Sequence, residues 1–214
     1  MSESDTLRQQ GAQPDGEGAA RTPAVKRSRP KPGERRVQIL QALAAMLEAP
    51  GSDRVTTAAL AARLEVSEAA LYRHFASKAQ MFEGLIEFIE SSVFALVDQI
   101  TSAGGDGRML ARRSVAAVLQ FAEANPGMTR VMVGDALVFE NDRLAVRMNH
   151  FFDRLESQLR QSLRDAAEAS GSTNAEAAAQ VHASVLTAFT VGRLQRFARS
   201  DFRRLPTDNL DGAL

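Results

Sequence analysis

Apolar residues recur at helical spacing along almost the whole chain after residue 33, and no alternating apolar run predicts a β-strand. A first helix is predicted from about Glu34 to Glu48. The pattern therefore predicts an all-α protein. The apolar face of the first helix is expected to consist of Val37, Leu40, Leu43, Ala44 and Leu47.

Two short helices are predicted next, and each begins at a residue that can cap it. The run Val55-Thr56-Thr57 offers a threonine N-cap to a helix that carries Leu60, Ala61 and Leu64, and Ser67 caps the helix SEAALYRHF. A long fourth helix begins at the capping box SKAQ, in which Ser77 and Gln80 can each satisfy a terminal backbone donor, and it runs to about residue 101.

The second half of the chain also shows helical periods. Helices are predicted over residues 108–124, through Met132 and Leu137, over residues 142–169 and over residues 174–202. Two long amphipathic helices of this kind can pair within a monomer or across a dimer. Their apolar positions are Leu144, Met148, Phe151, Phe152, Leu155, Leu159 and Leu163, then Val181, Val185, Phe189, Gly192 and Phe197.

Composition divides the chain into four parts. Residues 1–33 hold four of the seven prolines and few large apolar residues, so we expect a disordered tail. We expect a DNA-binding domain over residues 34–80, a helical regulatory and dimerisation domain over residues 81–205, and a tail over residues 206–214. The chain has no Cys, no run of 18 apolar residues and no signal-peptide pattern at its N-terminus, which favours a cytoplasmic location.

The three N-terminal helices are typical of a helix-turn-helix unit, with the recognition unit at about residues 56–75. The third helix of such a unit enters the major groove of DNA. Leu71 and Phe75, four residues apart, can face the small core, so that the polar residues between them face outward.

These outward residues suit contacts with DNA. Tyr72 and His74 can donate to phosphates, Arg73 can reach a phosphate or a guanine, and the neighbouring alanines allow a close approach to base edges. The alternative is that Tyr72 and His74 are surface side chains without a ligand. The full set of expected DNA contacts is Thr56, Thr57, Ser67, Glu68, Ala69, Ala70, Tyr72, Arg73, His74 and Lys78.

The net charge is zero, but its distribution is uneven. Seven basic residues against one acid between Arg21 and Arg36 form a basic arm beside the helix-turn-helix unit, where it can follow phosphates or enter the minor groove. A solvated tail is the alternative. The arm residues expected at the DNA backbone are Lys26, Arg27, Arg29, Lys31, Arg35 and Arg36.

The stretch VSEAALYRHFASK resembles the recognition-helix signature of TetR-family regulators. The resemblance implies a DNA-binding homodimer, and most such proteins are repressors with a small-molecule pocket in the C-terminal domain. One position departs from the family pattern: Glu65 stands in the turn where Gly is common, so a left-handed backbone is expected at this residue.

Further segments, including NPGMTRVMVGDALVFENDRL and RFARSDFRRLPTDNLD, resemble the SlmA family of nucleoid occlusion factors, and this resemblance extends from about Arg35 to Asn209. It implies a homodimer, associated with the nucleoid, that binds palindromic chromosomal sites in double-stranded DNA. It also implies binding to the C-terminal tail of the division protein FtsZ, which disrupts FtsZ polymers so that no septum forms over the nucleoid.

In the SlmA family the FtsZ tail lies in a groove between the fourth and fifth helices. Phe88 falls off the buried stripe of the fourth helix, as does Phe94 on the opposite flank, and Phe88 and Asn125 match groove residues of the family. Packing against neighbouring helices is an equal alternative for Phe88. The other groove positions hold Leu96, Ala117, Gln120 and Ala124, where the family pattern has Arg, Leu, Gly and Arg.

The resemblance assigns the last two long helices to a four-helix dimer interface, and one recognition helix per chain needs a dimer to read a palindrome. The interior of a monomer is the alternative. The expected interface residues are Phe151, Leu155, Leu159, Val185, Phe189 and Gly192.

Nothing in the sequence predicts an enzyme, a metal site or a cofactor. The three histidines lack metal-ligand spacing, and Glu83, Glu87 and Glu90 form a helical ladder that is more typical of a solvated face than of an acid and base pair. Two other functions stay open: a TetR-type repressor released by a small hydrophobic effector, with a closed cavity, and an architectural DNA-binding protein whose C-terminal domain only dimerises.

Overall fold

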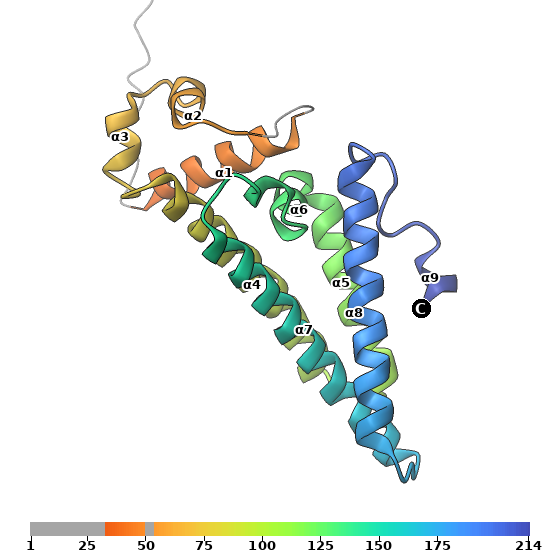
Figure 1. The fold of residues 1–214 in the computed structure, drawn as a ribbon. Coiled ribbons are helices and arrows are strands. Elements are labelled where there is room, and N and C mark those ends of the chain that lie inside the picture. Colours follow the sequence, from red (N-terminus) through yellow and green to blue (C-terminus); the bar gives the residue numbers. More distant parts are fainter. Residues whose placement is uncertain (1–32, 50–53) are drawn as a thin grey trace, which may run out of the picture. The chain divides into compact units, whose positions relative to one another are not determined.

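The computed structural model describes residues 33–49 and 54–214, and within these ranges the secondary structure is entirely helical (Figure 1). The described residues form one compact unit. The helices are α1 (Glu34–Glu48), α2 (Thr57–Arg63), α3 (Glu68–Tyr72), α4 (Lys78–Ser102), α5 (Gly107–Ala124), α6 (Pro126–Met132), the 3-10 helix η1 (Asp135–Leu137), α7 (Asp142–Ala169), α8 (Ala175–Arg199) and α9 (Leu210–Ala213). The all-α fold class is confirmed.

The bounds of α1 are those predicted, but its buried face is rotated. Ile39, Leu43 and Leu47 are buried, whereas Val37 is exposed. The expectation for Val37 was wrong because α1 packs against α2, α4 and α6 together, and these helices cover the arc that contains Ile39. Helix α6 begins at Pro126, directly after the helix predicted to end at residue 124, with proline in the first turn where its missing N–H has no intrahelical partner to lose.

Helix α4 is the long element that joins the N-terminal helices to the rest of the unit, where it packs on α1, α5, α6 and α7. Most of its predicted apolar stripe is buried, namely Phe82, Leu85, Ile86, Ile89, Val93 and Val97. Ile100 at the end of the stripe is half-buried, and Leu96 is 40% exposed. Phe94 is buried, contrary to the expectation that it lies off the stripe. Its ring centroid lies 5.2 Å from that of Phe151 on α7, and the guanidinium of Arg154 lies 3.7 Å from it.

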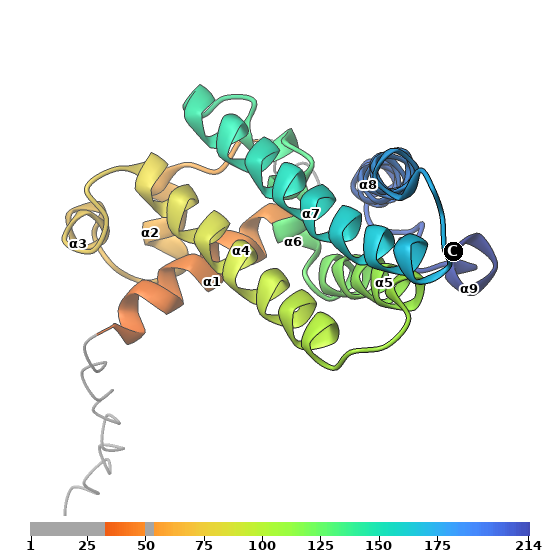
Figure 2. The same cartoon turned by 90° about the horizontal axis from the view of Figure 1, so that it is seen from below.

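Helices α7 and α8 form the most extensive helix pair of the unit, and α7 also lies along α4 (Figure 2). The α7 stripe is buried or half-buried as predicted. The face of α8 that packs on the core is rich in small residues. Their size allows α8 to approach α7 closely. This face is made of Ala179, Ala183, Thr187, Thr190, Leu194, Phe197 and Ala198.

The other face of α8 carries large apolar residues that one chain leaves uncovered. Val181 and Val185 are 61% and 60% exposed. After α8 the chain continues to the short helix α9, within the range expected to be a tail. None of the described helices is long and apolar enough to cross a membrane.

Candidate nucleic-acid interface

The recognition unit consists of the short helices α2 and α3, which pack on a small hydrophobic core. Leu60, Leu71 and Phe75 are almost fully buried, which fixes the unit against α1 and α4. Tyr72 is 45% exposed, and Arg73 is exposed beside it. The expected division is therefore present for Leu71, Phe75, Tyr72 and Arg73, whereas His74 is only half-exposed. The roles of the outward residues in DNA binding stay predictions.

Local hydrogen bonds explain why the sequence folds this way here. The hydroxyl of Thr56 accepts from the backbone N–H of Ala59 at 3.2 Å, and that of Ser67 accepts from Ala70 at 3.3 Å. Both predicted caps are present. Helix α3 ends at Tyr72, three residues before Phe75, so the segment after it is a turn.

The expected cap by Ser77 at the start of α4 is also confirmed, whereas Gln80 bonds the residue before Ser77 and not Ser77 itself. The hydroxyl of Ser77 accepts from the N–H of Gln80 at 3.1 Å, and the Gln80 side chain accepts from the N–H of Ala76 at 2.8 Å. These bonds fix the direction in which α4 leaves the recognition unit.

Two polar residues at the expected DNA surface are bonded to each other. The hydroxyl of Thr57 on α2 donates to the carboxylate of Glu68 on α3 at 2.6 Å. This bond holds the two helices of the recognition unit together, so Glu68 has a structural role that its sequence position did not suggest.

The turn between α2 and α3 contains the predicted left-handed residue. Glu65 has φ 55°, and the N–H of Val66 donates to the carbonyl of Ala61 at 3.0 Å, which closes the turn. The left-handed conformation places the Cβ of a non-glycine residue close to the following carbonyl, so Glu65 stores some strain.

The basic arm is described only at its end. Arg36 stacks on the ring of Phe75 at 4.1 Å and donates to the carbonyl of His74, while Arg35 donates to Gln38 at 3.1 Å. The guanidinium of Arg36 is thus held at the end of the recognition unit. The arm residues Lys26, Arg27, Arg29 and Lys31 lie outside the described residues.

Lys78, another expected phosphate contact, has a partner within the chain. Its ammonium forms an ion pair with Glu140, which lies between η1 and α7. The sequence gave no indication of this pair, because the two residues are far apart in the chain and Glu140 belongs to no motif.

Two of the three ladder carboxylates on α4 also form ion pairs with α7. Arg143 lies 2.7 Å from Glu83, and Arg147 forms a bidentate contact with Glu90, at 2.5 and 3.1 Å. The hydrogen bond to Glu90, opposed by partial burial, raises the pKa of Arg147 above its ordinary value. These carboxylates therefore join two helices and are not a merely solvated face.

The residues expected to bind the FtsZ tail lie on the surfaces of α4 and α5. Phe88 and Leu96 on α4 are 48% and 40% exposed. At about 100° per residue, Phe88 lies some 140° around α4 from Glu83, and thus away from α7. On the α5 side, Gln120 and Ala124 are exposed.

The remaining two residues of this set are half-buried. Ala117 lies on α5, and Asn125 follows that helix and donates through Nδ2 to the carbonyl of Phe121 at 2.7 Å. We call the six residues the α4–α5 surface. Its members are Phe88, Leu96, Ala117, Gln120, Ala124 and Asn125.

The expected dimer interface requires a correction. Phe151, Leu155 and Leu159 are at most 1% exposed within one chain, so they have no surface to offer to a second subunit. Their stripe packs in the core of the unit. Val185 is exposed, and Phe189 and Gly192 on the same helix are partly exposed, so these three remain candidates.

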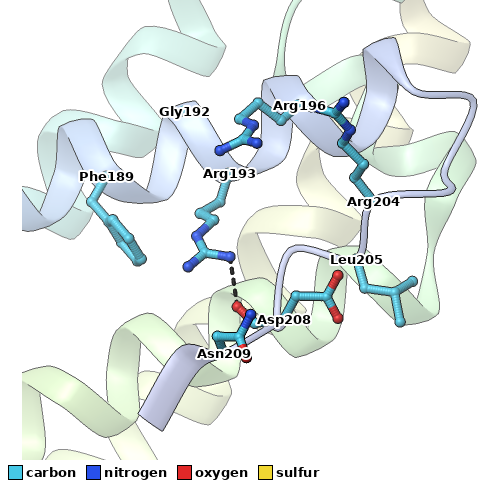
Figure 3. Close-up of a pocket in the computed structure, with 8 residues that line it drawn as sticks. All are labelled: Phe189, Gly192, Arg193, Arg196, Arg204, Leu205, Asp208 and Asn209. Carbon is cyan, nitrogen blue, oxygen red and sulfur yellow. Dashed lines mark hydrogen bonds between the residues drawn. The ribbon is translucent and has the colours of Figure 1, made fainter. Parts of the chain in front are cut away.

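A pocket of about 570 Å³ lies at the C-terminal end of α8 (Figure 3). Arg193, Arg196 and Arg204 line it together with Phe189 and Leu205, and Arg193 donates to the backbone carbonyl of Asp208 at 2.7 Å. This open, arginine-lined pocket differs in character from the closed apolar cavity that a hydrophobic effector would need.

The fold and the helix-turn-helix geometry define a DNA-binding protein of the TetR type. The family described as "Bacterial regulatory proteins, tetR family" matches residues 39–85, and the family described as "Tetracyclin repressor-like, C-terminal domain" matches residues 109–213. The nucleoid occlusion factor SlmA of Alteromonas mediterranea is 47% identical over 88% of this chain and 94% of that protein. The SlmA of Photobacterium profundum is 50% identical over 85% and 92%. The chain belongs to the SlmA family of nucleoid occlusion factors.

Solved structures agree on the fold alone. The fatty acid degradation regulator FadR of Bacillus halodurans superposes with a TM-score of 0.64 at 17% identity, over 86% of this chain and 94% of that chain. A ketosteroid transcriptional regulator of Mycobacterium tuberculosis gives a TM-score of 0.61 at 20% identity, over 84% and 90%. The names of the relatives denote regulators and a nucleoid occlusion factor, not a family of enzymes.

Proposed function

We propose that this protein is a nucleoid-associated inhibitor of cell division in the cytoplasm that binds palindromic chromosomal sites and the C-terminal tail of FtsZ at the same time. The observation that carries the proposal is identity near one half to SlmA proteins across both the DNA-binding and the C-terminal regions. C-terminal regions of TetR-type proteins usually diverge with function, so a likeness that includes this region supports a shared activity.

For DNA binding, the recognition unit offers its polar face and the arm offers charge. Tyr72 is exposed at the end of α3 and Arg73 is exposed directly after it, and Arg36 is held against Phe75 at the end of that unit. Guanidinium and phenol groups bind phosphates and base edges, and each neutralised phosphate adds affinity that salt weakens. A palindrome presents two half-sites, so the proposal requires a homodimer.

For the FtsZ tail, we infer binding across the α4–α5 surface. Phe88 and Leu96 are large, exposed apolar side chains, and such residues are the usual anchors of a bound peptide. Leu96 and Ala124 stand where the SlmA pattern has arginines, so apolar contact contributes more to tail binding in this chain and charge contributes less. Binding of the tail to this protein should therefore be less sensitive to salt than its binding to DNA.

The experiment that tests the proposal is sedimentation of GTP-driven FtsZ polymers from the same organism. This protein is added alone, with a palindromic duplex selected from its own genome, or with a scrambled duplex. Phe88→Ala is the test variant. Phe139→Ala is the matched control, because Phe139 is 66% exposed and lies outside the α4–α5 surface.

The expected result is that the wild-type protein and Phe139→Ala dissolve polymers only with the specific duplex. Phe88→Ala should leave polymers intact although it binds the duplex normally. If the wild-type protein binds the duplex tightly and polymers persist in every condition, the FtsZ part of the proposal fails. Release of the duplex by a small hydrophobic molecule would then support an effector-controlled repressor instead.

A further inference from the structure

The ion pair between Lys78 and Glu140 lies at the junction of the recognition unit and the C-terminal region. The Glu140 side chain is 10% exposed and that of Lys78 is 25% exposed. The ring of Phe82, with its centroid 5.7 Å from the ammonium, shields one side of the pair from water. In the described ranges, Lys78 is the only residue that makes a hydrogen bond or ion pair with the carboxylate of Glu140.

Three ion pairs connect α4 with α7 or with the segment that precedes α7, and the pair of Lys78 and Glu140 is the first of them along α4. In the other two, Glu83 with Arg143 and Glu90 with Arg147, α4 supplies the carboxylate. At the first pair the polarity is reversed and α4 supplies the cation.

The reversal is unfavourable for the helix itself. Lys78 is the first residue of α4, where the positive end of the helix dipole opposes a cation and favours an anion. Helix stability therefore gives no reason for a lysine here. A phosphate would be favoured at the same position, both by the ammonium and by the helix terminus.

We propose that Lys78 is shared between Glu140 and a backbone phosphate of bound DNA, so that Glu140 is an internal competitor of DNA. This inference rests on the DNA binding proposed above. A phosphate that approaches Lys78 meets the negative charge of Glu140 beside the same ammonium. It either draws the ammonium away from Glu140 or binds against the repulsion of the carboxylate, and both outcomes weaken DNA binding.

The competition also connects DNA binding with the C-terminal region. Glu140 ends the segment from Gly134, which carries the exposed side chains of Val138 and Phe139 and leads into α7. When a phosphate takes the ammonium of Lys78, this segment loses its ion pair with α4. DNA binding is thereby coupled to the attachment of the α7 N-terminus, some sixty residues along the chain from the recognition unit.

The test is the affinity for the palindromic duplex, measured by fluorescence anisotropy at several salt concentrations. Glu140→Gln removes the competitor and keeps the shape of the side chain. Glu83→Gln is the matched control, because it removes the same charge from the neighbouring ion pair on α4. We expect Glu140→Gln to bind the duplex about 3- to 10-fold more tightly than the wild-type protein at low salt, and Glu83→Gln to bind it less than about 2-fold more tightly. The difference is expected because Glu140 is the partner of the phosphate-binding lysine and Glu83 is not.

The Lys78→Ala background separates direct competition from a general effect of charge. There, Glu140→Gln should no longer tighten binding, because the shared ammonium is gone. An equal gain in this background, or a gain no larger than that of Glu83→Gln, would overturn the inference. Glu140→Ala is measured in parallel as a second variant, in case Glu140→Gln does not fold.

The two proposals fail in distinguishable ways. If the wild-type protein binds no palindromic duplex, the proposed function is overturned and this inference falls with it. If the wild-type protein binds and Glu140→Gln and Glu140→Ala change nothing, the competition alone is overturned and the proposed function stands.

Discussion

Gly127 on α6 packs directly against the backbone of Ala44 on α1: a Cβ at residue 127 would stand 1.9 Å from the carbonyl oxygen of Ala44. It would also lie 3.1 Å from the backbone nitrogen of Glu48. Both neighbours are backbone atoms inside a helix, so neither can move without moving α1. The contact therefore holds the first helix of the DNA-binding region to the C-terminal region at one point.

Gly127→Ala is expected to destabilise the fold by about 3 kcal/mol or more, because relief of the overlap requires α6 to separate from α1. Thermal unfolding followed by circular dichroism measures the loss. Gly212→Ala is the control, since a Cβ there meets nothing within 4 Å, and its midpoint should stay close to that of the wild-type protein. An unchanged midpoint for Gly127→Ala would contradict a direct backbone contact between α6 and α1 at this residue.

Glu65→Gly is expected to have a small effect on stability in the favourable direction. Relief of the left-handed backbone at φ 55° contributes about 1–2 kcal/mol. The greater freedom of glycine in the unfolded chain offsets about 0.5–1 kcal/mol of this gain. Chemical denaturation at equilibrium measures the difference. Glu65→Ala is the control: it removes the carboxylate and keeps the strain, so a gain of the same size in Glu65→Ala would assign the effect to charge.

Local features of the fold were predictable from the sequence, because each depends on neighbouring residues. The caps at Ser67 and Ser77 and the left-handed turn at Glu65 are of this kind. Contacts between distant segments were not. Lys78 and Glu140 carry no local signal of their pairing, which exists only because α4 and the start of α7 lie together in the fold.

The orientation of α8 shows what a pattern of apolar positions leaves open. Its larger residues, Val181 and Val185, could be assigned from the sequence to packing within one chain or against a second subunit, and within one chain they are exposed. The core side instead carries Ala179 and Ala183, because small side chains allow α7 and α8 to pack closely. Valine is more hydrophobic than alanine, but only a small side chain fits between two closely packed helices.

Arg73→Ala is expected to weaken binding to the palindromic duplex and to reduce its dependence on salt. Arg73 is exposed directly after α3, where its guanidinium can neutralise one phosphate of each half-site. Loss of one phosphate contact reduces the salt slope by about 1 per subunit. Titrations by anisotropy between low and moderate salt measure this slope. Arg199, exposed at the C-terminal end of α8 and outside the recognition unit, provides the control variant Arg199→Ala. An equal loss of affinity in both variants would indicate a general effect of charge.

Val185→Asp is expected to dissociate the homodimer. Val185 is 60% exposed in one chain and lies on the apolar face of α8 with Val181, so an aspartate there would place a charge in an apolar contact between two subunits. Sedimentation equilibrium should give the mass of one chain for this variant and of two chains for the wild-type protein.

Val138→Asp is the matched control for this variant, because Val138 is 69% exposed and belongs to the segment before α7, not to the apolar face of α8. It should remain a dimer. Since a palindrome is read by two recognition helices, Val185→Asp should also bind the full site no better than a half-site. If Val185→Asp remains a dimer, the interface does not lie on this face of α8. If the variant is monomeric and still binds the full site better than a half-site, palindrome recognition does not depend on this dimer.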